Sequence, residues 1–308
     1  MNFFSSFFSK PSVDILIDEQ INRRKLYLRD EDYNRVILPA FYDKEHVTGA
    51  VQVNLTSKSF DHNGIKIMLL GLIQSTTDKK NESQFITLTK ELCPAGKLVN
   101  QSNKFPFAFN NVEKQYESYR GIEFNVRYIL RVIISCSLRN LTWEREFGVA
   151  RPETKEILTT LNDPIKMDVG IEDWLHLSFE LDRTKYSTKD VITGRVTFKK
   201  VSMKLKLMLL QIIRRETIIG GEMDNAVLCK FEIMDGGPIK NEIIPIRFYL
   251  RPYDFTPTIE NANNRLSVTY MVSLVLVDIE NRKYFKRHEI TFHRIEKKKI
   301  DGKNEEKK

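Results

Sequence analysis

Apolar and polar residues alternate with a period of two along most of this chain. In VTGAVQVNL (47–55), every second residue is apolar or glycine and most residues between them are small or polar. Such alternation is typical of a β-strand with one buried face. Similar β-branched or aromatic runs lie at 64–74, 124–135, 174–182, 190–200, 203–216, 245–250 and 265–278. The pattern predicts an all-β chain, with short helices only at 87–95 and 155–163.

The strand pattern also repeats, because four pairs of segments match in the same order at offsets between 139 and 145 residues. A duplication of about seven strands per copy predicts two tandem β-sandwiches. Chance similarity between β-rich strings is the alternative, and the collinear order argues against it. The pairs are VTGAVQV (47–53) with ITGRVTF (192–198), KIMLLGLI (66–73) with KLMLLQII (206–213), FPFAF (105–109) with IPIRF (244–248), and VRYILRVII (126–134) with VTYMVSLVL (268–276).

The repeat divides the chain into three predicted parts. We expect an N-terminal sandwich over 1–152 and a C-terminal sandwich over 153–295. The charged, proline-flanked run ARPETKEILTTLNDP (150–164) separates the last strand of one copy from the first strand of the next. Residues 296–308 form a basic tail, which we expect to be solvated and disordered.

Net charge changes this picture little. The chain has 49 basic and 41 acidic residues, a net charge of +8, but most of the excess lies in residues 282–308. RKYFKRH (282–288) interleaves aromatic and basic residues, as single-stranded nucleic-acid binders do. The same alternation fits an edge strand whose charges prevent aggregation, and we favour that interpretation. We therefore expect no nucleic-acid partner.

The cysteines and the apolar segments indicate a cytoplasmic protein. Cys93, Cys136 and Cys229 lie far apart without CxxC spacing, which argues against a disulfide framework or a zinc site. No internal segment approaches the ~18 apolar residues of a membrane span. The N-terminal MNFFSSFFSK places four phenylalanines on one helical face. They would dock on the protein itself, on lipid or on a partner, and we favour the first.

Motifs for catalysis are missing from the sequence. It has no GxxxxGK[ST] loop, GxSxG elbow, HExxH pair or GxGxxG turn, and its five histidines are scattered. We therefore predict no enzymatic activity, no cofactor and no metal site. A rigid protein of two β-sandwiches works by binding, for example by adding an extended peptide to a sheet edge.

One turn carries an apolar pair where polar residues are usual. In KFEIMDGGPIK (230–240), Ile233 and Met234 run directly into Asp-Gly-Gly-Pro, which is turn chemistry. Alternation allows one member of the pair to face the core. The residues alone therefore leave a packing role and a docking role equally open.

Long segments of the chain resemble a known family. They are EKQYESYRGIEFNVRYILRV (113–132), KMDVGIEDWLHLSFE (166–180), KFEIMDGGPIKNEIIPIR (230–247), YDFTPT (253–258) and SVTYMVSLVLVDIENRKYFKRHEI (267–290). These segments resemble the arrestin-like subunit of the retromer complex, the Vps26 family of vacuolar protein sorting proteins, and the similarity runs from about residue 41 to about residue 292. The resemblance implies two tandem arrestin-like (immunoglobulin-like) β-sandwiches, in agreement with the repeat.

The resemblance implies a non-enzymatic coat subunit for endosome-to-Golgi or plasma-membrane retrieval, cytoplasmic and held peripherally and indirectly at endosomal membranes. It implies that a helical solenoid subunit of retromer binds Ile233 and Met234. It also implies that, with a sorting nexin, the protein captures cytosolic tails of transmembrane cargo. The pocket for that capture lies at the junction of the sandwiches and is lined by Val169 and Phe285.

The chain departs from the family pattern at three places. The link from Gly220 to Phe231 is short, which puts the shape of the approach to the docking turn in doubt. Trp174 stands where a smaller residue is usual, and Gln115 where proline is common. The nearest rival hypothesis is an arrestin-type scaffold that binds phosphorylated receptor tails. That class favours apolar and acidic residues in the C-terminal tail, whereas RIEKKKIDGKNEEKK is lysine-rich.

Overall fold

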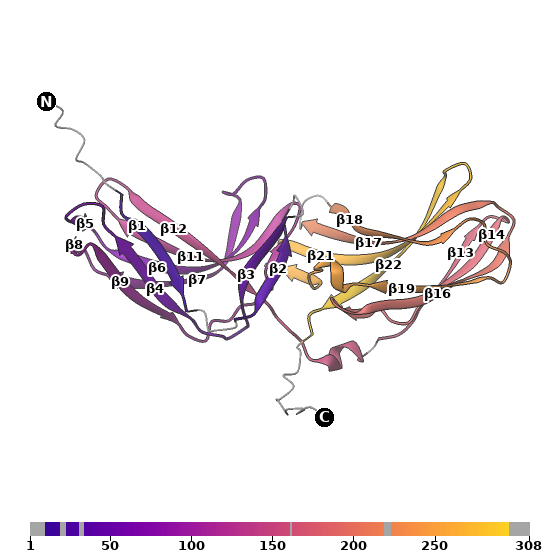
Figure 1. Ribbon diagram of the computed structural model, residues 1–308, viewed down its shortest axis with the longest axis horizontal. Coiled ribbons are helices and arrows are strands. Elements are labelled where there is room, and N and C mark those ends of the chain that lie inside the picture. Colours follow the sequence, from indigo (N-terminus) through magenta and orange to yellow (C-terminus); the bar gives the residue numbers. More distant parts are fainter. Residues whose placement is uncertain (1–9, 19–22, 31–33, 161, 219–222, 296–308) are drawn as a thin grey trace, which may run out of the picture. The chain divides into compact units, whose positions relative to one another are not determined.

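The structure is a computed structural model that describes residues 10–18, 23–30, 34–160, 162–218 and 223–295. The N-terminal phenylalanines and the basic tail therefore lie outside the described residues. Contacts divide the chain into two compact units, with the first running to Arg151 and also including Ile218–Asp224 and Asn261–Leu266. Each unit is a β-sandwich (Figure 1), so the predicted all-β class is confirmed.

The first sandwich packs a three-stranded sheet against a larger one. Aromatic rings fill its core, where Phe147 contacts Phe41 at 5.1 Å and Tyr128 at 5.8 Å between ring centroids. The small sheet has the order β1 (Ser12–Ile17), β4 (Val47–Asn54), β9 (Ser102–Phe109). The large sheet has the order β2 (Lys25–Arg29), β3 (Arg35–Phe41), β12 (Asn140–Val149), β11 (Phe124–Ser135), β6 (Ile65–Ser75), β7 (Glu82–Cys93), with β10 (Tyr119–Arg120) beside β11; β5 (Phe60–His62) pairs with β8 (Gly96–Leu98).

The second sandwich has the same plan. Its core contains Tyr270, whose ring lies 4.7 Å from that of Phe292. One sheet has the order β13 (Ile165–Ile171), β14 (Leu175–Leu181), β16 (Val191–Val201), β19 (Ile243–Tyr249). The other has the order β15 (Lys185–Ser187), β22 (Lys283–His293), β21 (Leu266–Asp278), β17 (Leu205–Ile218), β18 (Met223–Asp235), with β20 (Ile259–Ala262) beside β21. Short 3-10 turns lie at η1 (Lys155–Leu158) and η2 (Arg251–Tyr253).

The predicted helix at 87–95 is wrong, because residues up to Cys93 continue strand β7. This strand pairs antiparallel with β6 as far as Ile65, so tertiary pairing overrides the local helical preference. The second predicted helix, at 155–163, is present only as the single turn η1.

The four repeated sequence pairs fall on equivalent strands of the two sandwiches. They occupy β4 and β16, β6 and β17, β9 and β19, and β11 and β21. In each copy the first of these strands pairs with the third: β4 with β9, and β16 with β19. Gly49 and Gly194 occupy the same repeat position, and a Cβ at either would overlap a carbonyl oxygen of the neighbouring strand. The duplication therefore extends to close backbone contacts.

Four turns of the second sandwich meet at one end, which we call the turn end. They join β13 to β14, β16 to β17, β18 to β19, and β21 to β22. Backbone hydrogen bonds connect these turns to one another and to the start of β17. The N–H groups of Ser202, Gly236 and Ile279 donate to the carbonyls of Trp174, Lys206 and Lys204 at 2.7, 2.7 and 3.2 Å. Residues distant in the sequence are thereby gathered at one surface.

Candidate functional site

The apolar pair that the sequence singled out lies on the last residues of β18, at the turn end. Gly236 follows in a left-handed conformation (φ 89°), which glycine adopts without strain. Met234 is only 9% exposed and belongs to the protein's own packing, whereas Ile233 is half-buried. Ile233 is therefore the member of the pair that a partner would reach more directly.

Two further apolar residues at this turn are more exposed than the predicted pair. Ile239 is 72% exposed and Ile243 is 56% exposed. The backbone N–H of Ile239 donates to the Glu242 carboxylate at 2.8 Å, so the turn has a defined conformation. Sequence reasoning missed both residues. The signal available was an isoleucine directly after the proline of a Gly-Gly-Pro turn, where no strand alternation directs a side chain inward.

Val169 and Phe285 lie on different sheets of the second sandwich. Val169 is half-buried on β13, which ends its sheet, and shares the core-directed face of that strand with Ile165 and Met167. Phe285 on β22 is 52% exposed, and the Arg287 guanidinium lies 5.6 Å from the centroid of its ring. Strand alternation thus directs Val169 toward the core and Phe285 toward solvent.

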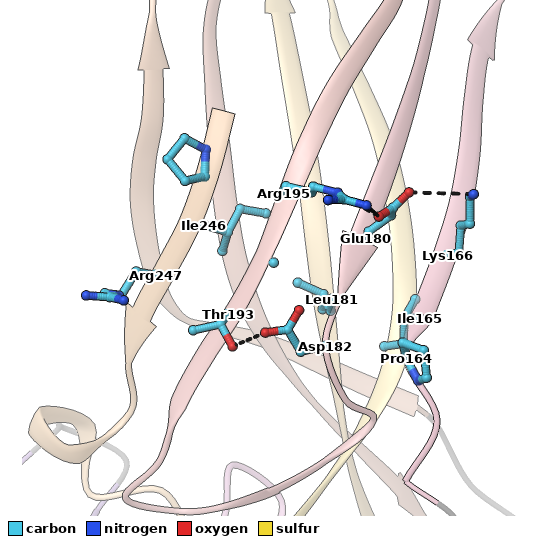
Figure 2. A pocket seen from close by; sticks show the side chains of 12 residues that line it. Pro164, Ile165, Lys166, Glu180, Leu181, Asp182, Thr193, Arg195, Ile246 and Arg247 are labelled. Atoms are coloured by element: carbon cyan, nitrogen blue, oxygen red, sulfur yellow. Dashed lines mark hydrogen bonds and ion pairs between the residues drawn. The ribbon is translucent and has the colours of Figure 1, made fainter. Parts of the chain in front are cut away.

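A wide trough of about 870 Å³ crosses the four-stranded sheet of the second sandwich (Figure 2). Its floor is strand backbone, because the residues between its two walls face the core. One wall is the cross-strand row Pro245, Arg195, Glu180 and Lys166, and the other contains Arg247, Thr193 and Asp182.

Charges in the trough largely neutralise one another. The Glu180 carboxylate binds Arg195 at 2.7 Å and Lys166 at 3.7 Å, and the Thr193 hydroxyl donates to Asp182 at 2.5 Å. The hydrogen bond from Arg195 holds the pKa of the Glu180 carboxyl below its ordinary value. This carboxylate is consequently ionised and serves as the centre of an ion-pair row. Among the described residues, no group of three or more His, Cys, Asp or Glu side chains is placed to hold a metal ion.

A buried polar cluster in the first sandwich ties the start of the resembling segment 113–132 to residues 43–45. Lys114 is fully buried, and its ammonium donates to the carbonyls of Glu45 (2.7 Å) and Val112 (3.0 Å). Its backbone N–H donates to Asp43 at 2.8 Å, and Arg23 pairs with Glu45 at 2.7 Å. Burial lowers the pKa of Lys114 to about 8. The segments around residues 41–46 and 113–116 are thus joined through backbone carbonyls and one buried cation.

The fold defines the class of protein: two tandem arrestin-like β-sandwiches. The family model described as "Vacuolar protein sorting-associated protein 26" matches residues 7–281. The chain therefore belongs to the Vps26 family, which confirms the resemblance stated from the sequence.

Curated relatives agree with this assignment. The chain is 41% identical to Vacuolar protein sorting-associated protein 26B-like of Danio rerio over 299 residues, which cover 96% of this chain and 89% of that protein. It is 40% identical to Vacuolar protein sorting-associated protein 26B of Mus musculus and of Homo sapiens, with 96% of this chain and 88% of each relative covered. In the described part of the structure, no helix combines the length and apolar character needed to cross a membrane.

Proposed function

We propose that this chain is a non-enzymatic adaptor of a retromer coat, held peripherally at endosomal membranes by its partners. Membership of the Vps26 family supports the coarser part of this function, a retromer subunit in vacuolar protein sorting. In the finer part, the second sandwich binds the end of a helical solenoid subunit and, with a sorting nexin, captures cytosolic tails of transmembrane cargo. The observation that carries the proposal is the apolar turn after β18 in a chain that matches the family across this region.

The solenoid binds at the turn that carries Ile233, and Met234 supports that turn from beneath. The half-buried Ile233 at the end of β18, together with the exposed Ile239 and Ile243 on the connection from β18 into β19, offers apolar side chains to the face of a partner helix. Met234, at 9% exposed, holds the end of β18 against the sandwich. The two residues therefore have different roles and must be varied separately.

The test is co-purification of the solenoid subunit with tagged full-length variants, together with melting temperatures. Ile233→Asp places a charge in the apolar contact, so we expect affinity to fall by at least about tenfold, as for an interface hot spot. Leu88→Asp on β7 is the matched control, because Leu88 is also apolar and is 39% exposed. Met234→Leu keeps volume and apolarity, so it should retain binding. Wild-type yield of the solenoid with Ile233→Asp would overturn the site.

Cargo capture is assigned to Phe285 on β22 and Val169 on β13, which belong to the two different sheets of the second sandwich. Since Phe285 is half-exposed on a strand edge, a second protein is needed to complete an enclosed pocket around it. We expect Phe285→Ala to weaken cargo-peptide binding only when the sorting nexin is present. Isothermal titration with and without the nexin measures this, and Tyr249→Ala, at a residue 55% exposed on β19, is the matched control. Equal affinities for Phe285→Ala and the wild type in the presence of the nexin would contradict the assignment.

A further inference from the structure

Three turns of the second sandwich line an open pocket of about 440 Å³, which we call the turn-end pocket. Its apolar walls come from the end of β13, the start of β22, and the turns that join β13 to β14, β16 to β17, and β21 to β22. The residues that form these walls are Ile171, Trp174, Met203, Ile279 and Tyr284. Neither the Ile233–Met234 pair nor Val169 and Phe285 line it. The pocket therefore has a lining of its own, which adjoins the proposed cargo residues through Ile171 on β13 and Tyr284 on β22.

The hairpin on one side of the pocket is fixed by a buried carboxylate. Asp278 is 1% exposed and accepts hydrogen bonds from the backbone N–H groups of Glu280 and Arg282, both at 2.9 Å. Its second oxygen accepts from Arg282 Nε at 2.7 Å and from the Tyr284 hydroxyl at 3.3 Å. Ile279 and Tyr284 are thereby placed by a network that needs no ligand.

The indole on the opposite side is held equally well. Trp174 donates its Nε1–H to Glu172 at 3.2 Å, and its backbone N–H donates to the Ile171 carbonyl at 2.9 Å. Its own carbonyl accepts from the Ser202 N–H at 2.7 Å, which ties this turn to the next. Because these walls are already positioned in the free protein, binding costs less conformational entropy of the side chains.

The two most exposed apolar side chains of the pocket stand in turns and face solvent. Trp174 is 55% exposed and Ile279 is 59% exposed. A rigid aromatic face opposite a branched aliphatic side chain is the usual surface for burying another apolar group, because both sides lose water on contact. A ligand that bound through charge alone would gain nothing from this apolar surface.

The charges around the pocket nearly cancel, and this selects among possible occupants. Lys204 and Arg282 stand against Glu172, Asp278 and Glu280, and Arg282 is already bound to both Asp278 (2.7 Å) and Glu280 (3.1 Å). Acidic lipid requires an excess of basic residues at the surface. A strongly charged peptide of either sign likewise gains little from a nearly balanced rim.

We propose that the turn-end pocket binds one bulky apolar side chain, aromatic or branched aliphatic, presented by a short uncharged segment of a protein partner. The side chain enters between the Trp174 indole and Ile279, and Ile171 and Met203 supply further apolar contact. Binding is driven by burial of apolar surface and is therefore insensitive to salt.

Fluorescence of Trp174 tests the proposal directly in the full chain. The sequence has two tryptophans, so Trp143→Phe leaves Trp174 as the single reporter. The probe is the capped pentapeptide Gly-Ser-Phe-Ser-Gly, and the control peptide has serine in place of phenylalanine. We expect a blue shift of Trp174 emission with the phenylalanine peptide at millimolar concentration and none with the control. Equal responses to the two peptides would overturn the proposal.

Two variants of the reporter protein separate the pocket from the rest of the turn end. Ile279→Ser should weaken binding by about tenfold, the loss expected when a buried isoleucine contact is removed. Ile243→Ser, at a residue of similar exposure (56%), should leave binding unchanged. Equal losses in both variants would contradict the site, with folding checked by urea midpoints.

Two further measurements test the proposal: the salt dependence of peptide affinity, and the response of Trp174 emission to lipid vesicles. Affinity should change less than about twofold between about 50 and 500 mM salt, because no ion pair is formed on binding. A steep fall in affinity with increasing salt would indicate that the occupant binds through charge and would overturn the proposal. A blue shift caused by phosphatidylcholine–phosphatidylserine vesicles but not by the phenylalanine peptide would identify a lipid surface as the occupant and overturn the proposal.

Discussion

The two sandwiches share a framework and differ in where they place unusual chemistry. Gly49 and Gly194 occupy equivalent positions on β4 and β16, and each lets a neighbouring strand approach closely. Tyr128 and Tyr270 are likewise equivalent, and both are buried with a hydrogen-bonded hydroxyl. These shared residues lie in strand pairings and the core. They show that the duplicated part of the sequence encodes packing.

The differences lie in loops and turns. The first sandwich buries Lys114 in a loop, with its ammonium bound to two backbone carbonyls. The second sandwich exposes apolar side chains at its turn end, among them Trp174, Ile239 and Ile279, and the first exposes Val99 and Leu138 in turns of its own. Loops tolerate such divergence because their side chains do not determine strand pairing. The proposed binding residues therefore differ between the two copies, whereas the framework of paired strands is shared.

Alanine at the equivalent glycines should have the largest effect and should be equal in the two copies. Gly49→Ala and Gly194→Ala each force a Cβ into a carbonyl oxygen of the adjacent strand, at a cost of about 3 kcal/mol in unfolding free energy. Urea unfolding measures the loss. Gly170→Ala is the control, because no atom lies within 4 Å of its added Cβ. A mild effect at one glycine alone would break the equivalence of the two frameworks.

Lys114 should give only the first sandwich a particular pH dependence. Its pKa is lowered in the folded state to about 8 from a usual 10.5, so the unfolded chain binds more protons between these values. Stability should therefore rise from about pH 8 toward pH 10, by on the order of 2 to 3 kcal/mol in total. Lys114→Met removes this rise, and the measurement is the difference in unfolding free energy between the two proteins across that range. Parallel pH profiles for wild type and variant would contradict the buried-cation interpretation.

The equivalent tyrosines should differ in how much their hydroxyls contribute. The Tyr128 hydroxyl donates to the Tyr116 carbonyl at 2.7 Å and accepts from the Tyr116 N–H at 3.2 Å. The Tyr270 hydroxyl is hydrogen-bonded to the Thr256 hydroxyl at 2.8 Å, a side-chain partner that can rotate to another orientation, whereas the Tyr116 backbone groups cannot. We expect Tyr128→Phe to cost about 2 kcal/mol and Tyr270→Phe about 1 kcal/mol. Thermal unfolding of both variants checks the order, which equal losses would contradict.

Much of this framework could be predicted from the sequence. Period-two alternation located the strands, and collinear repeats such as 47–53 with 192–198 gave two copies of one plan. The prediction failed at 87–95, where a helical pattern is overruled by pairing of β7 with β6. Sequence periodicity reports local burial, whereas an exposed edge strand is held by its neighbour and leaves a weak pattern.

The candidate site was less predictable, because it depends on which residues the turns bring together. The sequence identified the Ile233–Met234 turn but left open which member faces inward, and the structure buries Met234. It noted Trp174 only as a departure from the family pattern. The proximity of Trp174 to Ile279, more than a hundred residues later, follows from hydrogen bonds between turns. No local pattern encodes such a contact.

The smallest effect is expected where the copies differ at the surface of a shared strand. Arg195 stands at the repeat position that Ala50 occupies in the first copy, and its guanidinium binds Glu180 at 2.7 Å in the trough of Figure 2. Solvent-exposed ion pairs of this kind contribute little, since water and salt screen them. Arg195→Ala should leave the urea midpoint unchanged within error at physiological salt. Gly194→Ala, one residue earlier on the same strand, is the positive control for disturbed packing. A large loss with Arg195→Ala would mean that the second copy depends on a charge row that the first copy does without, so the two frameworks would not be equivalent after all.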